Sequence, residues 1–318
     1  MTEPAIDSHL LDKLNKLQQK YDVMGQDLSS YLDGLLHADY LTYWDYIHVD
    51  TLLSLQNPKT QFPDEKIFII YHQITELYFK LILLEVDQLA NNNSLNSTFF
   101  ATRIDRIIRY FEQLITSFSV MVDGMEKEQF LKFRMALLPA SGFQSAQYRF
   151  IEICSTDVVN LVDQNYRHSI DEIYNLKDQL DKLYWRSGAT ELATGKKTLT
   201  LKQFEQKYSD QFLELAIEYK EKNLRKLYMR HFSTDKTIIE KLRKFDLLSN
   251  VMWPLAHLRS AGHYLQKSPE DIKATGGTNW QKYLPPKFRK VMFFPELWTD
   301  QEKLEWGKPA VDAMVTFK

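Results

Sequence analysis

The residues best placed for chemistry are two histidines that lie inside apolar stretches. Of the 8 histidines, His72 lies in IFIIYHQITELYF and His257 in NVMWPLAHLRSAGHYL. No two histidines show HExxH spacing, and one cysteine, Cys154, cannot build a structural zinc site. A lone histidine on an apolar helix is more often a hydrogen-bonded core residue than a ligand. A single neutral imidazole on a helical wall is, however, how proteins hold haem iron from one side.

Charged groups in similar surroundings are further candidates. His72, Glu76 and Lys80 are spaced i, i+4, i+8 and share one face of a helix. Burying them costs several kcal/mol unless they are paired, so they form either a satisfied polar stripe or a site. Arg134 lies in the aromatic-rich segment EQFLKFRMALLPASGFQSAQYRFIE together with Arg149. A guanidinium there forms a structural ion pair or, facing a cavity, binds a carboxylate through two hydrogen bonds.

Helices must position these residues. The chain has 318 residues, with 10 glycines and 10 prolines, which is about half of average usage and typical of long helices. Hydrophobic periodicity predicts an all-α bundle of long helices in a single domain, residues 1–318. The predicted helices cover about 10–36, 64–90, 98–122, 127–137, 143–165, 169–185, 201–229 and 235–266.

Some segments have more specific expectations. The helix over 64–90 is apolar nearly all round, which is typical of a helix enclosed on all sides. Pro254 should kink or break the last long helix. Residues 186–198 are polar and contain glycine, so we expect an exposed excursion there. The segment ATGGTNW, residues 274–280, is either a simple connection or a glycine hinge that closes over a ligand.

Composition and motifs exclude several classes. Forty basic residues against 42 acidic ones give a net charge of -2, which signals no nucleic-acid partner. There is no GxSxG, GxGxxG or Walker motif to support serine hydrolysis, dinucleotide binding or P-loop chemistry. No run approaches 18 uninterrupted apolar residues, so we expect no membrane span. The single cysteine and the acidic, polar N-terminus favour a cytoplasmic location.

Five segments, in this order, resemble the tryptophan 2,3-dioxygenase family: PDEKIFIIYHQITELYFK, FRMALLPASGFQSAQYRFIE, WPLAHLR, ATGGT and FFPELW. The matching region covers about Leu41 to Trp298, and the first two segments are long enough to be specific. The resemblance implies a helical haem enzyme that cleaves the indole C2=C3 bond of L-tryptophan with O₂. The implied product is N-formyl-L-kynurenine, in the first step of tryptophan degradation by the kynurenine pathway. It also implies haem b in each subunit, active as Fe(II), and a homotetramer built as a dimer of dimers.

The resemblance assigns roles by position. His257 in WPLAHLR matches the proximal histidine that coordinates haem iron. His72 matches the distal histidine, which accepts the indole N–H without binding iron. Phe68 matches an aromatic residue that packs on the substrate, and Arg134 matches the arginine that pairs with the substrate carboxylate.

Further matches lie in loops and near the N-terminus. Thr275 matches the loop threonine that reaches the substrate ammonium, and Gly142 falls where the chain passes close above the haem. Tyr43 and Tyr46 match a tyrosine pair donated by a neighbouring subunit. The N-terminal segment 1–50 is therefore expected to pack on that neighbour.

The sequence departs from the family pattern at three places. Phe130, one turn before Arg134, stands where a tyrosine commonly helps to bind the carboxylate. Trp44 and Asp45 stand between the two tyrosines, where glycines are usual. The spacer from His257 to the ATGGT loop is also a few residues longer, and TNW replaces the usual serines.

Two alternatives remain open. The first is a related haem oxygenase acting on another indole or aromatic amino acid, which Phe130 and the altered loop motivate. The second is a haem-binding helical protein without activity. The joint presence of His72, Arg134 and Thr275 favours an enzyme, because haem storage needs only His257.

Overall fold

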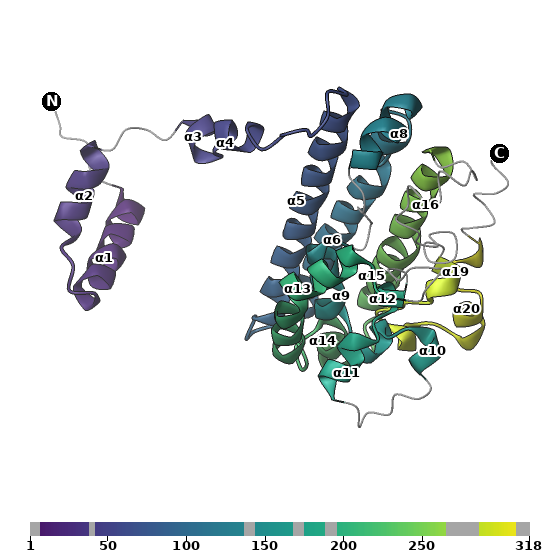
Figure 1. The fold of residues 1–318 in the computed structure, drawn as a ribbon. Coiled ribbons are helices and arrows are strands. Elements are labelled where there is room, and N and C mark those ends of the chain that lie inside the picture. Colours follow the sequence, from purple (N-terminus) through teal and green to yellow (C-terminus); the bar gives the residue numbers. More distant parts are fainter. Residues whose placement is uncertain are drawn as a thin grey trace. The chain divides into compact units, whose positions relative to one another are not determined.

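The structure is a computed structural model that describes residues 7–37, 42–136, 144–167, 175–187, 196–264 and 286–309. Figure 1 shows that its regular elements are helices. An isolated antiparallel bridge joins Val162 and Leu183. The predicted all-α fold is therefore confirmed. The chain divides into two compact units, residues Met1–Leu55 and Gln56–Lys318.

The N-terminal unit consists of short helices that bury little. Its elements are α1 (Ser8–Val23), α2 (Leu28–His37), α3 (Tyr43–Tyr46) and α4 (Val49–Leu53). The helix predicted over 10–36 is interrupted because Gly25 adopts a positive φ of 64°, a conformation that ends a helix at little cost for glycine. Leu28 is the one buried apolar residue among the described residues of this unit. Its packing on a neighbouring subunit stays a prediction.

The larger unit contains the longest helices, α5, α6 and α13, together with many shorter ones. In chain order its described helices are α5 (Asp64–Ala90), α6 (Ser97–Ser117), α7 (Ser119–Val122), α8 (Lys127–Ala136), α9 (Ala146–Ser155), η2 (Val158–Leu161), α10 (Gln164–Arg167), α11 (Leu176–Asp181), α12 (Tyr184–Ser187), α13 (Leu199–Glu218), α14 (Leu224–His231), α15 (Lys236–Leu247), η3 (Leu248–Met252), α16 (Trp253–Tyr264), α19 (Pro286–Arg289), η4 (Pro295–Leu297) and α20 (Asp300–Leu304).

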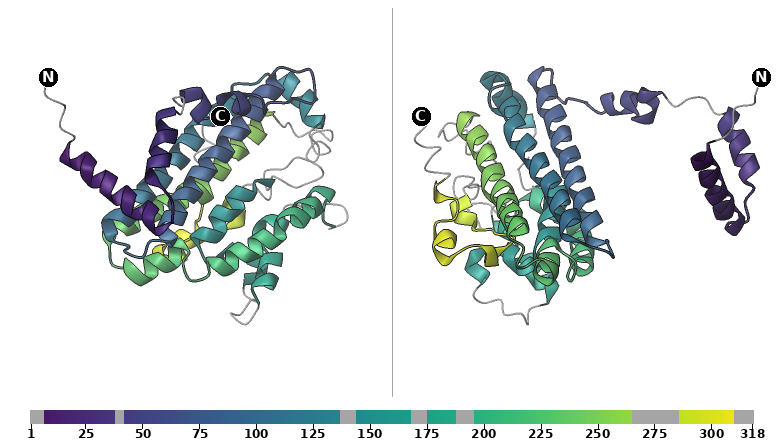
Figure 2. Two further views of the ribbon diagram at one scale, coloured as in Figure 1. Left: turned by 90° about the vertical axis from the view of Figure 1, so that its left-hand side faces the viewer. Right: turned by 180° about the vertical axis from the view of Figure 1, so that it is seen from behind.

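Helices α5, α6 and α16 form the frame around the core. Seen from behind in Figure 2, these helices stand next to one another, and α6 contacts both α5 and α16. Helix α8 also contacts both α5 and α16. The shared core includes Phe79 of α5, Phe111 of α6 and Trp253 of α16, all buried. The frame therefore brings together α5, α8 and α16, the three helices that carry candidate site residues.

Long-range contacts, not local pattern, end several helices earlier than predicted. The helix expected over 143–165 stops at Ser155, because Thr156 donates a hydrogen bond to the Phe293 carbonyl 2.5 Å away and Asp157 pairs with Arg225. The helix expected over 201–229 breaks before Asn223, whose side chain caps the next helix. The prediction for Pro254 is confirmed as an interruption: the π-helical turn η3 lies immediately before it.

The predicted enclosure of the helix over 64–90 is wrong for the single chain. Helix α5 has the predicted bounds and buries one face in the core, but apolar residues on its opposite face stay exposed. By length and composition alone α5 is apolar enough to cross a membrane, a test that core helices of soluble proteins also pass.

Candidate functional site

His72 is a neutral imidazole on the same side of α5 as Phe68. Its Nδ1 lies 2.7 Å from the Phe68 carbonyl oxygen one turn earlier, and the two rings stack with centroids 4.0 Å apart. Surrounding protein atoms lower the pKa of His72, although one side of the ring stays accessible. When Nδ1–H donates to that carbonyl, Nε2 carries the lone pair. His72 is thus arranged as a hydrogen-bond acceptor with an open side.

His257 on α16 has the same arrangement. Its Nδ1 lies 3.1 Å from the Trp253 carbonyl oxygen, and its ring packs against Phe118 and Trp253 at centroid distances of 4.6 and 4.4 Å. Burial, together with a smaller effect of the nearby His72, lowers the pKa of His257 to about 4. The two imidazoles therefore lie within electrostatic reach of each other, although they come from different helices.

The donor set fits a haem better than a metal site made by protein alone. Coordination requires a neutral imidazole with a free nitrogen, and the Nδ1 contact of His257 leaves Nε2 for that purpose. No group of three or more His, Cys, Asp or Glu residues in the described part of the chain could hold a metal ion. A single axial imidazole is sufficient only when a macrocycle supplies the other ligands.

Helix α8 adds an arginine and an aromatic wall. The Arg134 guanidinium carbon lies 5.8 Å from the centroid of Phe130. Phe130 contacts Phe68 of α5 at 6.5 Å and Tyr264 of α16 at 4.4 Å, so it bridges the two histidine helices. Phe133 completes the cluster, 5.8 Å from Phe68. A charged fork beside an apolar aromatic surface suits a ligand with an aromatic body and a carboxylate.

Polar contacts fix α8 in this position. The Asp64 carboxylate in the first turn of α5 accepts a hydrogen bond from the Glu126 amide, 2.6 Å away, just before α8 begins. The Tyr264 hydroxyl donates to the carbonyls of Val122 and Met125, 2.9 and 3.2 Å away. The first turn of α5, the chain just before α8 and the end of α16 are therefore tied together.

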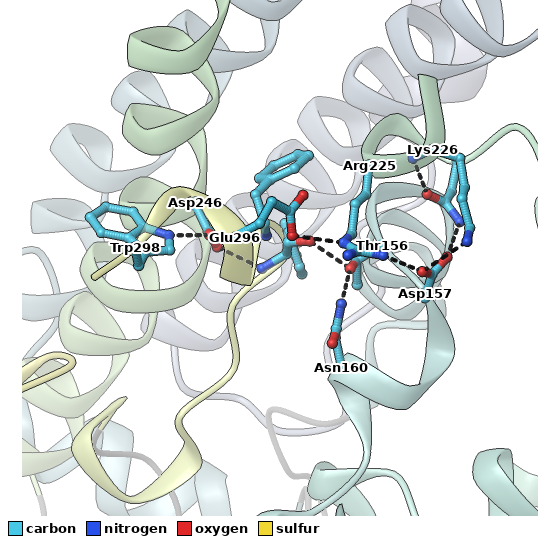
Figure 3. Close-up of polar contacts among 11 residues, drawn as sticks. Thr156, Asp157, Asn160, Arg225, Lys226, Asp246, Glu296 and Trp298 are labelled. Carbon is cyan, nitrogen blue, oxygen red and sulfur yellow. Dashed lines mark hydrogen bonds and ion pairs between the residues drawn. The ribbon is translucent and has the colours of Figure 1, made fainter. Parts of the chain in front are cut away.

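A buried carboxylate, which no sequence pattern had singled out, anchors the chain behind α16. Asp246 is fully buried and accepts hydrogen bonds from the amides of Phe293 and Phe294, the indole N–H of Trp298 and the Asn250 amide group (Figure 3). Burial raises its pKa to about 6, and these four donors oppose the rise. The anchored segment belongs to FFPELW, so this motif supports the helix that carries His257.

Two neighbouring ion pairs extend the anchor. Arg225 pairs with Glu296 through its Nε at 2.9 Å and with Asp157, which Lys226 also approaches (Figure 3). Trp298 and Leu255 belong to one small buried cluster on the back of α16. The back of α16 is thus packed, while Trp253 and His257 face the main core.

Two of the polar candidates, Arg149 and Glu76, have partners within the protein, as expected for a structural role. Arg149 pairs with Glu152 at 2.9 Å and donates to the Tyr184 hydroxyl at 3.0 Å, with both charged groups buried. Glu76 accepts from the Gln147 side chain at 2.9 Å. These residues are satisfied within the protein, whereas His72 keeps an open side.

Several predicted site residues do not belong to the described part of the larger unit. Gly142, Thr275 and the ATGGTNW loop lie outside the described residues. Tyr43 and Tyr46 belong to the N-terminal unit, where both side chains are exposed. Their roles stay predictions.

A cavity of about 380 Å³ lies elsewhere, between α5, α9 and α13. Asp87, Glu214 and Glu218 line it over a floor that includes Phe150 and the buried Cys154. It contains neither histidine of the cluster. We therefore place the candidate site at the histidines, which lie close to an arginine and an aromatic wall.

Comparison with known proteins identifies one family. A sequence model described as tryptophan 2,3-dioxygenase matches residues 35–236, most of the chain. That range includes His72 and Arg134 and ends before His257.

Curated relatives carry the same name. Tryptophan 2,3-dioxygenase of Sorangium cellulosum is 43% identical over 124 residues, which are 36% of this chain and 30% of the relative. That of Ruegeria sp. is 42% identical over 117 residues, or 36% and 41%. The alignments thus cover less than half of these two proteins. Tryptophan 2,3-dioxygenase of Polaromonas naphthalenivorans is 27% identical over 270 residues, covering 81% of this chain and 90% of the relative.

Proposed function

The chain belongs to the tryptophan 2,3-dioxygenase family, and we propose that it uses haem and O₂ to open the indole ring of L-tryptophan, giving N-formyl-L-kynurenine. The proposal rests on one observation above the others. Two neutral imidazoles from separate helices lie within electrostatic reach, beside an arginine and an aromatic wall. Those elements match a flat cofactor and an aromatic amino acid.

His257 is the residue that would hold haem b, through Nε2. Its neutral state persists far below neutral pH because burial lowers its pKa to about 4. The Trp253 carbonyl fixes the tautomer and the ring orientation. When bound, haem in its Fe(II) form supplies the oxygen chemistry, which no side chain of the cluster can supply.

His72 binds the substrate and does not coordinate the iron. Its Nε2 accepts the indole N–H, since Nδ1 is engaged with the Phe68 carbonyl. The same burial that lowers its pKa keeps the ring neutral and able to accept at pH 7. Phe68, stacked on His72, provides the apolar surface against which the indole packs.

Arg134 selects an amino acid over free indole. Its guanidinium stays charged, and it lies beside Phe130 at the aromatic wall. A hydrogen bond between this charged group and a substrate carboxylate would contribute about 1.5–3 kcal/mol, which favours tryptophan over indole. The resemblance adds Thr275 as the partner of the substrate ammonium and Gly142 as the close approach above the haem.

We further propose a homotetramer, a dimer of dimers, in which Tyr43 and Tyr46 reach a neighbouring site. Both side chains are 73% exposed, so they are available to a neighbour. A buried, unpaired Cys154 supports a reducing, cytoplasmic setting.

The test is turnover by the haem-loaded, reduced protein on admission of air, followed by the absorbance of formylkynurenine. His257→Ala should lose haem, whereas His263→Ala, an exposed histidine on the same helix, should keep it. Arg134→Ala should raise the KM for tryptophan by about tenfold or more, as expected for loss of 1.5–3 kcal/mol. Arg259→Ala, exposed on α16, is the matched control. A haem-loaded protein that leaves L-tryptophan intact would refute the proposal.

Phe130 supports one second candidate, a haem oxygenase of another indole or aromatic amino acid. Its ring contacts are aromatic and it offers no hydroxyl to a carboxylate. Mass spectrometry of products formed from isotopically labelled O₂ separates the two functions. Two labelled oxygen atoms in the product of L-tryptophan support the dioxygenase, whereas one labelled atom supports the second candidate.

A further inference from the structure

The exposed face of α5 forms a regular apolar seam. Five side chains on it are between 39 and 53% exposed: Ile70, Ile74, Leu77, Leu81 and Leu84. Their spacing alternates 4, 3, 4, 3, which is the a/d repeat of a helix that pairs with another helix. The partly buried Ile67 extends the repeat by one position. We call these six residues the α5 seam.

The seam lies on the side of α5 away from the candidate site. His72 follows Ile70 by two residues, which is about 200° around an α-helix. The core residues Phe79, Ile82 and Val86 also face away from the seam. In Figure 1, α5 stands at the outer edge of the helices of its unit. A partner on the seam would therefore leave the side carrying His72 unobstructed.

The order of residues along the seam matches a second copy of itself. In chain order the seam has three isoleucines followed by three leucines. When two copies run antiparallel about a point between Thr75 and Glu76, each isoleucine meets a leucine. Ile74 then faces Leu77 of the second copy, and Ile70 faces its Leu81. Such two-fold self-complementarity is what an isologous interface requires.

Charges beside the seam agree with the antiparallel direction. Lys66 and Asp87 are exposed and lie along the same edge, near opposite ends of α5. The antiparallel arrangement brings Lys66 of one copy near Asp87 of the other, twice per pair. A parallel arrangement would instead place the two copies of Lys66, and the two copies of Asp87, on opposite sides of the helix pair, so this charge pairing would be lost.

We propose that two copies of this chain associate through the α5 seam, with their α5 helices antiparallel. This assigns one interface of the tetramer proposed above, and it is independent of the reaction. Particle mass and turnover are measured separately, so a result that refutes the α5 interface does not refute the proposed reaction, and the reverse also holds.

The first experiment measures the mass of the full-length, haem-loaded protein by light scattering after size exclusion. Leu77→Lys places a charge at the centre of the seam and should halve the mass of the assembly. Ile217→Lys is the control, because Ile217 is 61% exposed on α13, outside the seam. The proposal is overturned if the mass of the Leu77→Lys assembly is unchanged while its haem content and helical circular dichroism also match the wild type.

The second experiment tests the direction of pairing. Lys66 and Asp87 are 21 residues apart, about 31 Å along one helix, which is too far for a disulfide within a chain. The double variant Lys66→Cys, Asp87→Cys should form a covalent dimer on oxidation, whereas each single variant should not. Dimers from the single variants would show that an edge residue meets its own copy, which antiparallel pairing through the seam does not allow, and would overturn the proposal. No dimer from any variant, the result expected if the N-terminal unit covers the seam, overturns it as well.

Discussion

Replacing Phe130 with tyrosine tests whether the aromatic wall of α8 lies beside the substrate carboxylate. Phe130 is half-buried, and its ring lies 5.8 Å from the guanidinium carbon of Arg134 and 4.4 Å from the ring of Tyr264. A hydroxyl on this ring would be placed near whatever anion Arg134 binds. The new side chain differs only by one oxygen, so the aromatic contacts should remain.

The magnitude follows from one added hydrogen bond. A hydrogen bond contributes about 0.5–1.5 kcal/mol net, which corresponds to a Kd or KM lower by about two- to twelvefold. If the hydroxyl found no partner, its loss of hydration would cost about 1–3 kcal/mol and raise the KM. The sign of the change therefore reports where the ring points.

The assay compares L-tryptophan with tryptamine, which has the same indole and amine but no carboxylate. Phe130→Tyr should lower the KM for L-tryptophan and leave competitive inhibition by tryptamine unchanged. Phe150→Tyr is the control, because Phe150 is a half-buried aromatic residue that packs on Phe212 of α13, away from Arg134. Equal changes for both ligands, or a KM that rises for both, would refute the placement of Phe130 beside the carboxylate.

Three other predictions concern the histidines and the frame. His72→Ala should keep its haem, measured by the Soret band, and lose only part of kcat/KM; complete loss of turnover would give His72 a more direct part. Haem-free protein should lose about 3 kcal/mol of stability as pH falls from 6.5 to about 4, because the pKa of His257 is lowered and the unfolded chain binds the proton first. Urea unfolding should show this in the wild type and not in His257→Gln, and equal slopes would contradict it. Glu85→Gln should cost about 3 kcal/mol in the same assay, since Glu85 is 2% exposed and pairs with Arg103 at 3.1 Å. Asp12→Asn, from an exposed pair, should change stability by less than about 0.5 kcal/mol, and equal losses would contradict the reasoning.

The sequence could predict elements that depend on local pattern. The bounds of α5 were predictable because Pro63 precedes an acidic first turn and the apolar pattern ends at Asn91. The interruption near Pro254 was predictable because proline lacks an amide donor. Its form, a π-helical turn before the proline, depends on Asp246 and Asn250 packing against a distant segment.

Contacts between distant segments set the limit of such prediction. The end of α9 at Ser155 depends on Thr156 meeting Phe293, 137 residues away, which no local pattern contains. The proximity of His72 and His257 likewise depends on how α6 and α8 pack between their helices. The resemblance named both residues, but the residues alone left each as a core histidine or a ligand.

The apolar character of α5 has two physical origins that composition cannot separate. One face is apolar because it fills the core of the chain, through residues such as Phe79 and Ile82. The opposite face, around Leu77, is apolar yet exposed to the extent of 49%. A hydrophobicity profile sums the apolar residues of both faces, and it therefore predicts a helix that its own chain encloses on all sides. The structure separates them, and the proposed pairing of two α5 helices would remove the second face from water, which is favourable for apolar surface.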